Sequence, residues 1–118
     1  MKTETDTRHT GAHQEKIAAA VLAQWGFSIL RMNYRSRFGE IDIIAMEKDV
    51  LCFIEVKYRR DLSAGYPAEA VTKRKQMRII RTSLKFLSEY GLAEAAYRYD
   101  VVEIVGRQIR IIRNAFGG

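Results

Sequence analysis

Two acidic residues and one lysine occur in segments that otherwise have the composition of buried β-strands. Asp42 lies in the run GEIDIIA (residues 39–45), and Glu55 and Lys57 lie in the run FIEVK (residues 53–57). Almost all of the remaining positions in both runs are apolar, which is typical of strands covered on both faces. Burying a charged side chain is costly unless a partner or a metal ion compensates it. The pattern therefore indicates a functional site and, more specifically, a site for a divalent metal ion held against a phosphodiester.

Alternation along the strands decides which of these side chains can meet. Side chains at every second position of a strand share one face. We therefore expect one shared face for Glu40, Asp42 and Ile44 and another for Phe53, Glu55 and Lys57. If the hairpin register places Asp42 opposite or diagonal to Glu55, their carboxylates converge on one ion.

Hard oxygen ligands of this kind suit Mg²⁺, which binds oxygens at ~2.0–2.1 Å and keeps several waters. The predicted ligands are Asp42, Glu55 and the backbone carbonyl of Val56. Such an ion polarises a phosphate and lowers the pKa of a bound water. Lys57 is positioned to orient that water or to stabilise developing negative charge.

Glu15 is a third acidic candidate, at the border of the apolar face of the first predicted helix. It either extends to the metal or its waters, or is an ordinary glutamate favoured near a helix N-terminus by the helix dipole. From the residues alone the second interpretation is favoured.

Composition indicates a single globular domain with 118 residues, 47% of them hydrophobic and 29% charged. We expect residues 1–10 to be disordered and residues 11–116 to form the domain. One cysteine, Cys52, excludes an internal disulfide and a cysteine-based zinc site. No apolar run approaches the ~18–20 residues that cross a bilayer, and the polar N-terminus does not resemble a secretory signal. A cytoplasmic protein without a membrane partner is expected.

The charge distribution favours a nucleic-acid partner. The net charge is +6, and residues 57–85 contain nine basic residues but only two acidic ones. Neutralising phosphates releases counterions, so such a surplus favours polyanions. One helix carries Arg74, Arg78, Arg81 and Lys85 in a stripe without interleaved acids; a solvated helix face is the alternative. The candidate nucleic-acid-binding residues are Arg35, Arg37, Arg59, Arg60, Lys73, Arg74, Lys75, Arg78, Arg81 and Lys85.

Periodicity and turn residues give the order of the elements. Helices are predicted over residues 14–25 and 69–90, the second with an apolar stripe of Met77, Ile80, Leu84 and Leu87. Strands are predicted over residues 27–34, 40–46, 50–57, 97–105 and 108–113. The order α-β-β-β-α-β-β predicts an α/β (α+β) fold with the sheet between two helices.

Many short motifs in this order resemble one family. They include GxxxE (residues 11–15), NYR (33–35), GEID (39–42), FIEVKxR (53–59), GxPxEAV (65–71), Lys75, RYDVV (98–102) and NAF (114–116). Together they resemble the YraN family of predicted endonucleases, which is similar to archaeal-type Holliday junction resolvases within the PD-(D/E)xK restriction-endonuclease-like superfamily.

The resemblance implies a restriction-endonuclease-like domain with a mixed central sheet flanked by helices. It implies that Asp42, Glu55 and Lys57 are the catalytic signature, and that Glu15 matches the helix glutamate of the resolvases, which reverses the interpretation favoured above. The expected cofactor is Mg²⁺, for which Mn²⁺ can substitute, and a homodimer is expected by analogy with junction resolvases.

Three functional hypotheses follow. The leading one is a Mg²⁺-dependent endonuclease that hydrolyses DNA, with branched or junction DNA as a candidate substrate. The second is a non-catalytic nucleic-acid-binding protein that retains the nuclease fold. The third is a structural or protein-interaction role, in which the buried acids pair with arginines.

Overall fold

The computed structural model describes residues 4–63 and 71–117, with side chains from residue 11 onward. Its elements are α1 (Glu4–Gln24), β1 (Phe27–Ser36), β2 (Gly39–Glu47), β3 (Val50–Arg59), α2 (Lys73–Glu89), β4 (Tyr97–Val105) and β5 (Gln108–Phe116). This is the predicted order. The expected loop over residues 59–68 and the start of the second helix at Glu69 fall largely outside the described residues. No helix in the described part of the chain is long and apolar enough to cross a membrane.

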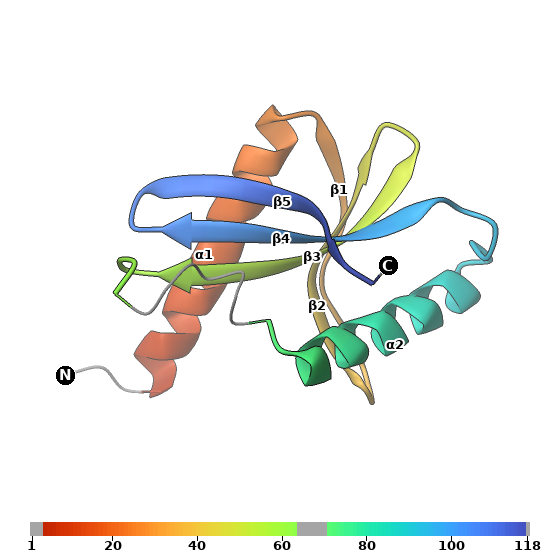
Figure 1. Cartoon of the computed structure of the whole chain (residues 1–118), viewed down its shortest axis with the longest axis horizontal. Helices are drawn as coiled ribbons and strands as arrows, with labels where there is room; N and C mark the ends of the chain where they lie inside the picture. The colour runs from red at the N-terminus through yellow and green to blue at the C-terminus, as the bar shows by residue number, and fades with distance from the viewer. Residues whose placement is uncertain (1–3, 64–70, 118) are drawn as a thin grey trace.

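The strands form one mixed sheet in the order β1-β2-β3-β4-β5 (Figure 1). Neighbouring strands are antiparallel except β3 and β4, which are parallel and are connected through α2. α1 packs on one face of the sheet and α2 on the other, so the central strands are covered on both sides. The predicted architecture, a mixed central sheet flanked by helices, is confirmed.

Each helix packs over a separate hydrophobic core. The buried core under α1 consists of Ala18, Leu22, Phe27, Ile43, Ala45, Cys52, Ile54, Val102 and Ile104. The buried core under α2 consists of Tyr34, Ile41, Ile44, Leu51, Phe53, Ile79, Phe86, Leu87 and Tyr99. Adjacent residues of β2 and β3 therefore enter different cores, which explains why both strands are apolar at consecutive positions.

α2 presents a different face to the sheet from the one predicted. Its buried residues are Ile79, Thr82, Ser83, Phe86 and Leu87, whereas Met77 and Leu84 are about half exposed. Of the predicted apolar stripe, Leu87 is buried and Ile80 packs against the core, whereas Met77 and Leu84 do not. The small hydroxyl side chains can be buried because Thr82 donates to the carbonyl of Arg78 at 2.9 Å and Ser83 donates to that of Ile80 at 2.6 Å.

α1 begins at Glu4, whereas the sequence predicts a helix from about residue 14 and disorder over residues 1–10. Residues 1–3 are outside the described range. Extending an existing helix by one residue is far easier than nucleating a new one, and residues 4–13 contain no proline. This explains how a polar segment continues the helix that Ala18 and Leu22 anchor.

A kink in β1 changes which face of the sheet β2 presents. Asn33 has a left-handed backbone (φ 54°) and no partner in the β1–β2 register, and the register itself shifts earlier, between Ile29 and Arg31. Met32 consequently packs under α1 although Tyr34, two positions on, lies in the core under α2. β2 follows the kink, so Asp42 approaches α1 while Ile44 is buried under α2. The prediction that Asp42 and Ile44 share a face is therefore wrong.

Candidate active site

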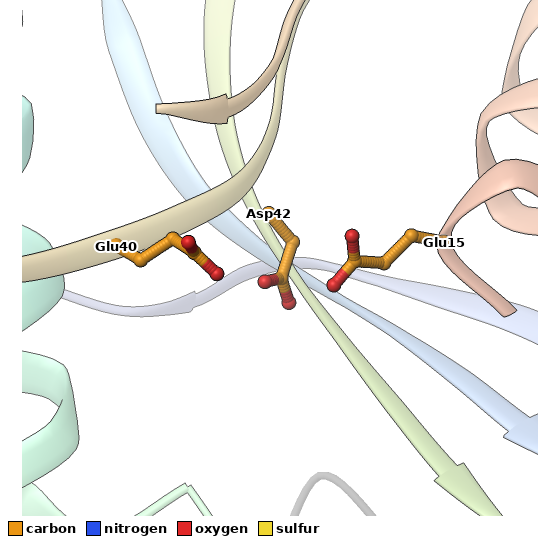
Figure 2. A group of neighbouring side chains, drawn as sticks. All are labelled: Glu15, Glu40 and Asp42. Carbon is orange, nitrogen blue, oxygen red and sulfur yellow. The ribbon is translucent and has the colours of Figure 1, made fainter. Parts of the chain in front are cut away.

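Three carboxylates converge at the point where α1 meets β2. One carboxylate oxygen from each of Glu15, Glu40 and Asp42 lies within 4.8 Å of the others, and we call this group the acidic cluster. Figure 2 shows Glu15 reaching from α1 and Glu40 from β2 toward Asp42, which lies between them. Two of these residues were predicted site residues. Glu40 was not, although alternation had already placed it on the face of Asp42.

Asp42 is buried at the place where two strands separate. Regular pairing between β2 and β3 ends at Ile43 and Ile54. The Asp42 carboxylate then accepts a hydrogen bond from the N–H of Val56 at 2.8 Å. Burial raises the pKa of Asp42, while the Val56 N–H and the charge of Lys75 act in the opposite direction. Because β2 and β3 separate here, Asp42 lies near Glu15 of α1 on one face of the sheet and is influenced by the charge of Lys75 of α2 on the other.

Glu55 has one paired carboxylate oxygen and one unpaired oxygen. Its Oε1 lies 3.5 Å from the ammonium nitrogen of Lys57 and 3.7 Å from that of Lys75. Its Oε2 is buried and, among the described residues, has no hydrogen-bond partner. Burial and the neighbouring Asp42 raise the pKa of Glu55 to about 7, although the two lysines lower it. An unsatisfied buried carboxylate oxygen is unfavourable and indicates a missing partner.

Other buried acids show what a purely structural arrangement looks like here. Asp100 is fully buried and accepts from Arg98 at 2.9 Å and from the N–H of Asn114 at 2.9 Å. Glu103 is buried and paired with Arg110. Asp42, in contrast, has no ion-pair partner within 4.0 Å among the described side chains. The third hypothesis, in which the buried acids pair with arginines, describes Asp100 and Glu103 rather than Asp42 and Glu55.

Glu15 lies beside Asp42 in the acidic cluster. Burial and then the charge of Asp42 raise the pKa of Glu15 to about 7, and a hydrogen bond with Asn33 lowers it. Glu15 is therefore partly protonated at neutral pH, which relieves repulsion within the acidic cluster. The kinked residue Asn33 thus contacts the same site that its backbone conformation helps to build.

These residues fit a hard divalent cation. The donor set consists of carboxylate oxygens, and the unpartnered Oε2 of Glu55 offers a ligand that nothing else satisfies. Burial and then the charge of Asp42 raise the pKa values of Glu15 and Glu55, and a cation here would offset the second of these effects. Asp42 and Glu55 remain the predicted metal ligands together with the Val56 carbonyl, and the acidic cluster adds Glu40 to the candidates.

Four of the predicted nucleic-acid-binding residues line one groove beside the site. The groove has a volume of about 660 Å³ and lies between the β1–β2 turn and α2. We call it the arginine groove, and its lining includes Arg37, Phe38, Arg74, Met77, Arg78 and Arg81. None of the residues that line it is acidic.

The other basic candidates lie elsewhere. Lys75 contacts Glu55, and Arg35 pairs with Glu40 at 2.5 Å, so both belong to the carboxylate site. Lys85 contacts Glu89 at 3.6 Å toward the far end of α2. The remaining candidates are outside the groove: Lys73, Arg59 and Arg60. The predicted stripe on α2 is therefore divided, and Lys85 is separated from the other three by its pairing with Glu89.

One solved structure with the same fold is that of a protein whose activity is described. It is that of Hjc from Archaeoglobus fulgidus, described as a Holliday junction resolvase from an archaeal hyperthermophile. The similarity has a TM-score of 0.56 at 21% sequence identity and covers 86% of this chain and 74% of that chain. At this identity the similarity shows the shared fold.

Sequence relatives cover nearly the whole chain. A UPF0102 protein of Lachnoclostridium phytofermentans is 46% identical over 107 residues, which is 90% of this chain and 91% of the relative. One from Desulforapulum autotrophicum is 43% identical over 117 residues, covering 96% and 97%. The profile described as "Uncharacterised protein family UPF0102" matches residues 14–104. The family resemblance read from the sequence is confirmed, and the chain belongs to the UPF0102 (YraN) family.

Proposed function

We propose that this protein is a Mg²⁺-dependent endonuclease that hydrolyses phosphodiester bonds in DNA, and that branched or junction DNA is its substrate. The observation that carries the proposal is Glu55: a buried carboxylate with one oxygen held by two lysines and the other without a partner, next to Asp42. The shared fold of a protein described as a junction resolvase supports the choice of substrate.

Each residue has a proposed task. Asp42, Glu55 and the carbonyl of Val56 hold the metal ion. When bound, the ion supplies Lewis-acid polarisation of the phosphate and a water of lowered pKa. Lys57 lies beside Glu55 and stabilises negative charge on the reacting oxygens. Glu15, with its raised pKa, exchanges a proton near the site.

Lys75 keeps Glu55 in its ionised, ligand-competent form, because it lies 3.7 Å from Oε1 and lowers the carboxyl pKa. The sequence assigned Lys75 to nucleic-acid binding, whereas its contact with Glu55 supports a positioning role. Two-fold junction DNA suits a two-fold dimer, and a homodimer remains part of the proposal.

The test is a cleavage assay on single-stranded, duplex, flap and four-way-junction DNA with Mg²⁺, Mn²⁺ or EDTA. We expect metal-dependent cleavage by the wild type, and none by Asp42→Asn or Glu55→Gln. Asp49→Asn is the matched control, since Asp49 is an exposed acid in the β2–β3 turn. If both site variants cut as well as the wild type, the assignment is wrong. Salt-sensitive binding without any metal-dependent cleavage would favour the non-catalytic DNA-binding alternative.

A further inference from the structure

The arginine groove has a chemical character that phosphate binding alone does not explain. Four guanidinium groups line it, and these suit phosphate oxygens. Two apolar side chains, Phe38 and Met77, also line it, and Met77 is 50% exposed. Phosphate groups offer an exposed methionine and an aromatic ring no apolar surface to contact. The groove therefore suits a ligand that has an anionic part and a flat, apolar part.

The Phe38 ring is held in a defined position. The guanidinium carbons of Arg37 and Arg81 lie 4.9 and 5.8 Å from its centroid, within the range of cation–π attraction. The Phe38 N–H donates to the Ser36 hydroxyl at 3.0 Å, and that hydroxyl contacts the Thr82 hydroxyl at 2.8 Å. The turn that carries Phe38 is thus fastened to α2, and the ring does not need to be ordered when a ligand binds.

The groove and the carboxylate site share two stretches of backbone. Gly39 lines the groove, and the next residue, Glu40, belongs to the acidic cluster. Arg74 lines the groove, and the next residue, Lys75, contacts Glu55. The arginine groove and the carboxylate site therefore adjoin along both of these stretches of chain.

We propose that the arginine groove binds an unpaired nucleotide adjacent to the cleaved phosphate, with its base against Phe38 and Met77 and its phosphates on the arginines. The inference rests on the proposed function and narrows its substrate class to DNA that has a single-stranded segment at the cleavage point. In a duplex the bases stack on one another, whereas an unpaired base is free to stack on a protein side chain. The positive charge of the groove favours binding of a polyanion, and the apolar side chains of Phe38 and Met77 favour contact with an exposed base.

A single tryptophan in the groove gives a direct readout. Trp25, the only tryptophan of the chain, is 44% exposed just after α1 and does not line the groove. In the double variant Trp25→Phe with Phe38→Trp, the only indole lies in the groove. Titration with oligothymidylate in EDTA, where no metal-dependent cleavage occurs, should quench its emission by stacking. No quenching, or equal quenching by a duplex of the same length, would overturn the proposal.

Binding measured by fluorescence polarisation in EDTA separates base stacking from charge. Phe38→Leu should weaken binding of single-stranded and flap DNA about 5- to 150-fold, the loss expected for one stacked base, and leave duplex binding unchanged. Phe38→Trp should retain the binding. Trp25→Leu, the matched aromatic replacement outside the groove, should change nothing. Arg78→Gln should weaken binding of all three DNAs and reduce the salt dependence by about one phosphate contact.

The outcomes distinguish this inference from the proposed function. If Phe38→Leu weakens duplex and single-stranded binding equally, or weakens neither, the groove does not bind an unpaired base, although metal-dependent cleavage by the wild type would stand. If the wild type binds none of the DNAs, both proposals are wrong.

Discussion

The Asp42 carboxylate accepts a hydrogen bond from the Val56 N–H at 2.8 Å, at the point where β2 and β3 separate. An asparagine can make the same bond through its amide oxygen, but it is not ionised and is a poorer metal ligand. The structural role of Asp42 and its proposed role in metal binding are therefore separable by experiment.

Asp42→Asn should raise the stability of the metal-free protein at neutral pH. Burial raises the pKa of Asp42, so the ionised carboxylate destabilises the folded state above the pKa of the unfolded chain. Thermal unfolding in EDTA should show a higher Tm for the variant. Added Mg²⁺ should raise the Tm of the wild type but not that of the variant, whereas Asp49→Asn should behave as the wild type. A full metal-induced shift in Asp42→Asn would contradict the assigned ligand.

Lys75→Gln should shift the pH dependence of cleavage. Lys75 lowers the pKa of Glu55, which still lies at about 7, so its removal raises that pKa further. Ionised Glu55 then becomes available only at higher pH, and the acid limb of the rate profile should move upward. The neighbouring Lys73 is exposed, and Lys73→Gln should leave the profile in place. A uniform loss of rate with an unmoved acid limb would show that Lys75 acts only on DNA binding.

Glu47→Gln should destabilise the protein at neutral pH but not in strong acid. Glu47 accepts from Arg113 at 2.8 and 2.6 Å and also pairs with Arg98, and these bonds lower its pKa from 4.5 to about 2. The stabilisation is complete above the unfolded pKa and is lost as the pH falls through the folded pKa. The full shift corresponds to roughly 3 kcal/mol, and solvent screening of the half-exposed Arg113 makes this an upper limit.

Urea unfolding of wild type and Glu47→Gln between pH 7 and pH 2 measures this difference. The gap in unfolding free energy should narrow below about pH 4.5, with Glu94→Gln as the control at an exposed acid. A gap that does not change with pH would mean that the arginine pairs contribute nothing measurable.

Cys52 should react only when the protein unfolds. Its side chain is fully buried, and burial raises the pKa of the thiol to about 12, so thiolate is scarce at neutral pH. A chromogenic disulfide reagent should label no thiol in the native protein and one per chain in denaturant. Because Cys52 lies in the core under α1, its labelling rate reports opening of that core. Rapid labelling of the native protein would show that this core opens readily.

Two substitutions at Asn33 separate its backbone from its side chain. Both Asn33→Gly and Asn33→Val remove the hydrogen bond to Glu15, but only valine opposes the left-handed φ of 54°. Asn33→Val should lose about 1 to 3 kcal/mol more stability than Asn33→Gly in urea unfolding. Valine should also abolish the metal-induced rise in Tm, because the kink positions Asp42. Equal effects of the two substitutions would contradict this role of the kink.

The sequence was sufficient for the order of the elements, and it singled out Asp42 and Glu55 as a pair whose role as metal ligands stays a prediction. Strong apolar periodicity identifies the elements, and charges within such runs stand out. It was not sufficient for the face of α2, since Thr82 and Ser83 look polar until their bonds to helix carbonyls are known. Alternation placed Glu40 on the face of Asp42, but the approach of Glu15 from α1 to both carboxylates depends on how the helix packs on the sheet, which the sequence pattern does not specify.

The separation of β2 from β3 determines the stage of folding at which the carboxylate site is complete. An unbroken sheet would keep the side chains under α1 apart from those under α2. Here Glu15 of α1 and Lys75 of α2 contact neighbouring carboxylates, Asp42 and Glu55, through the same opening. The site is complete only when both helices have docked, so a half-folded or truncated copy lacks it. If the proposed nuclease activity is correct, an incompletely folded copy therefore lacks the means to cut DNA.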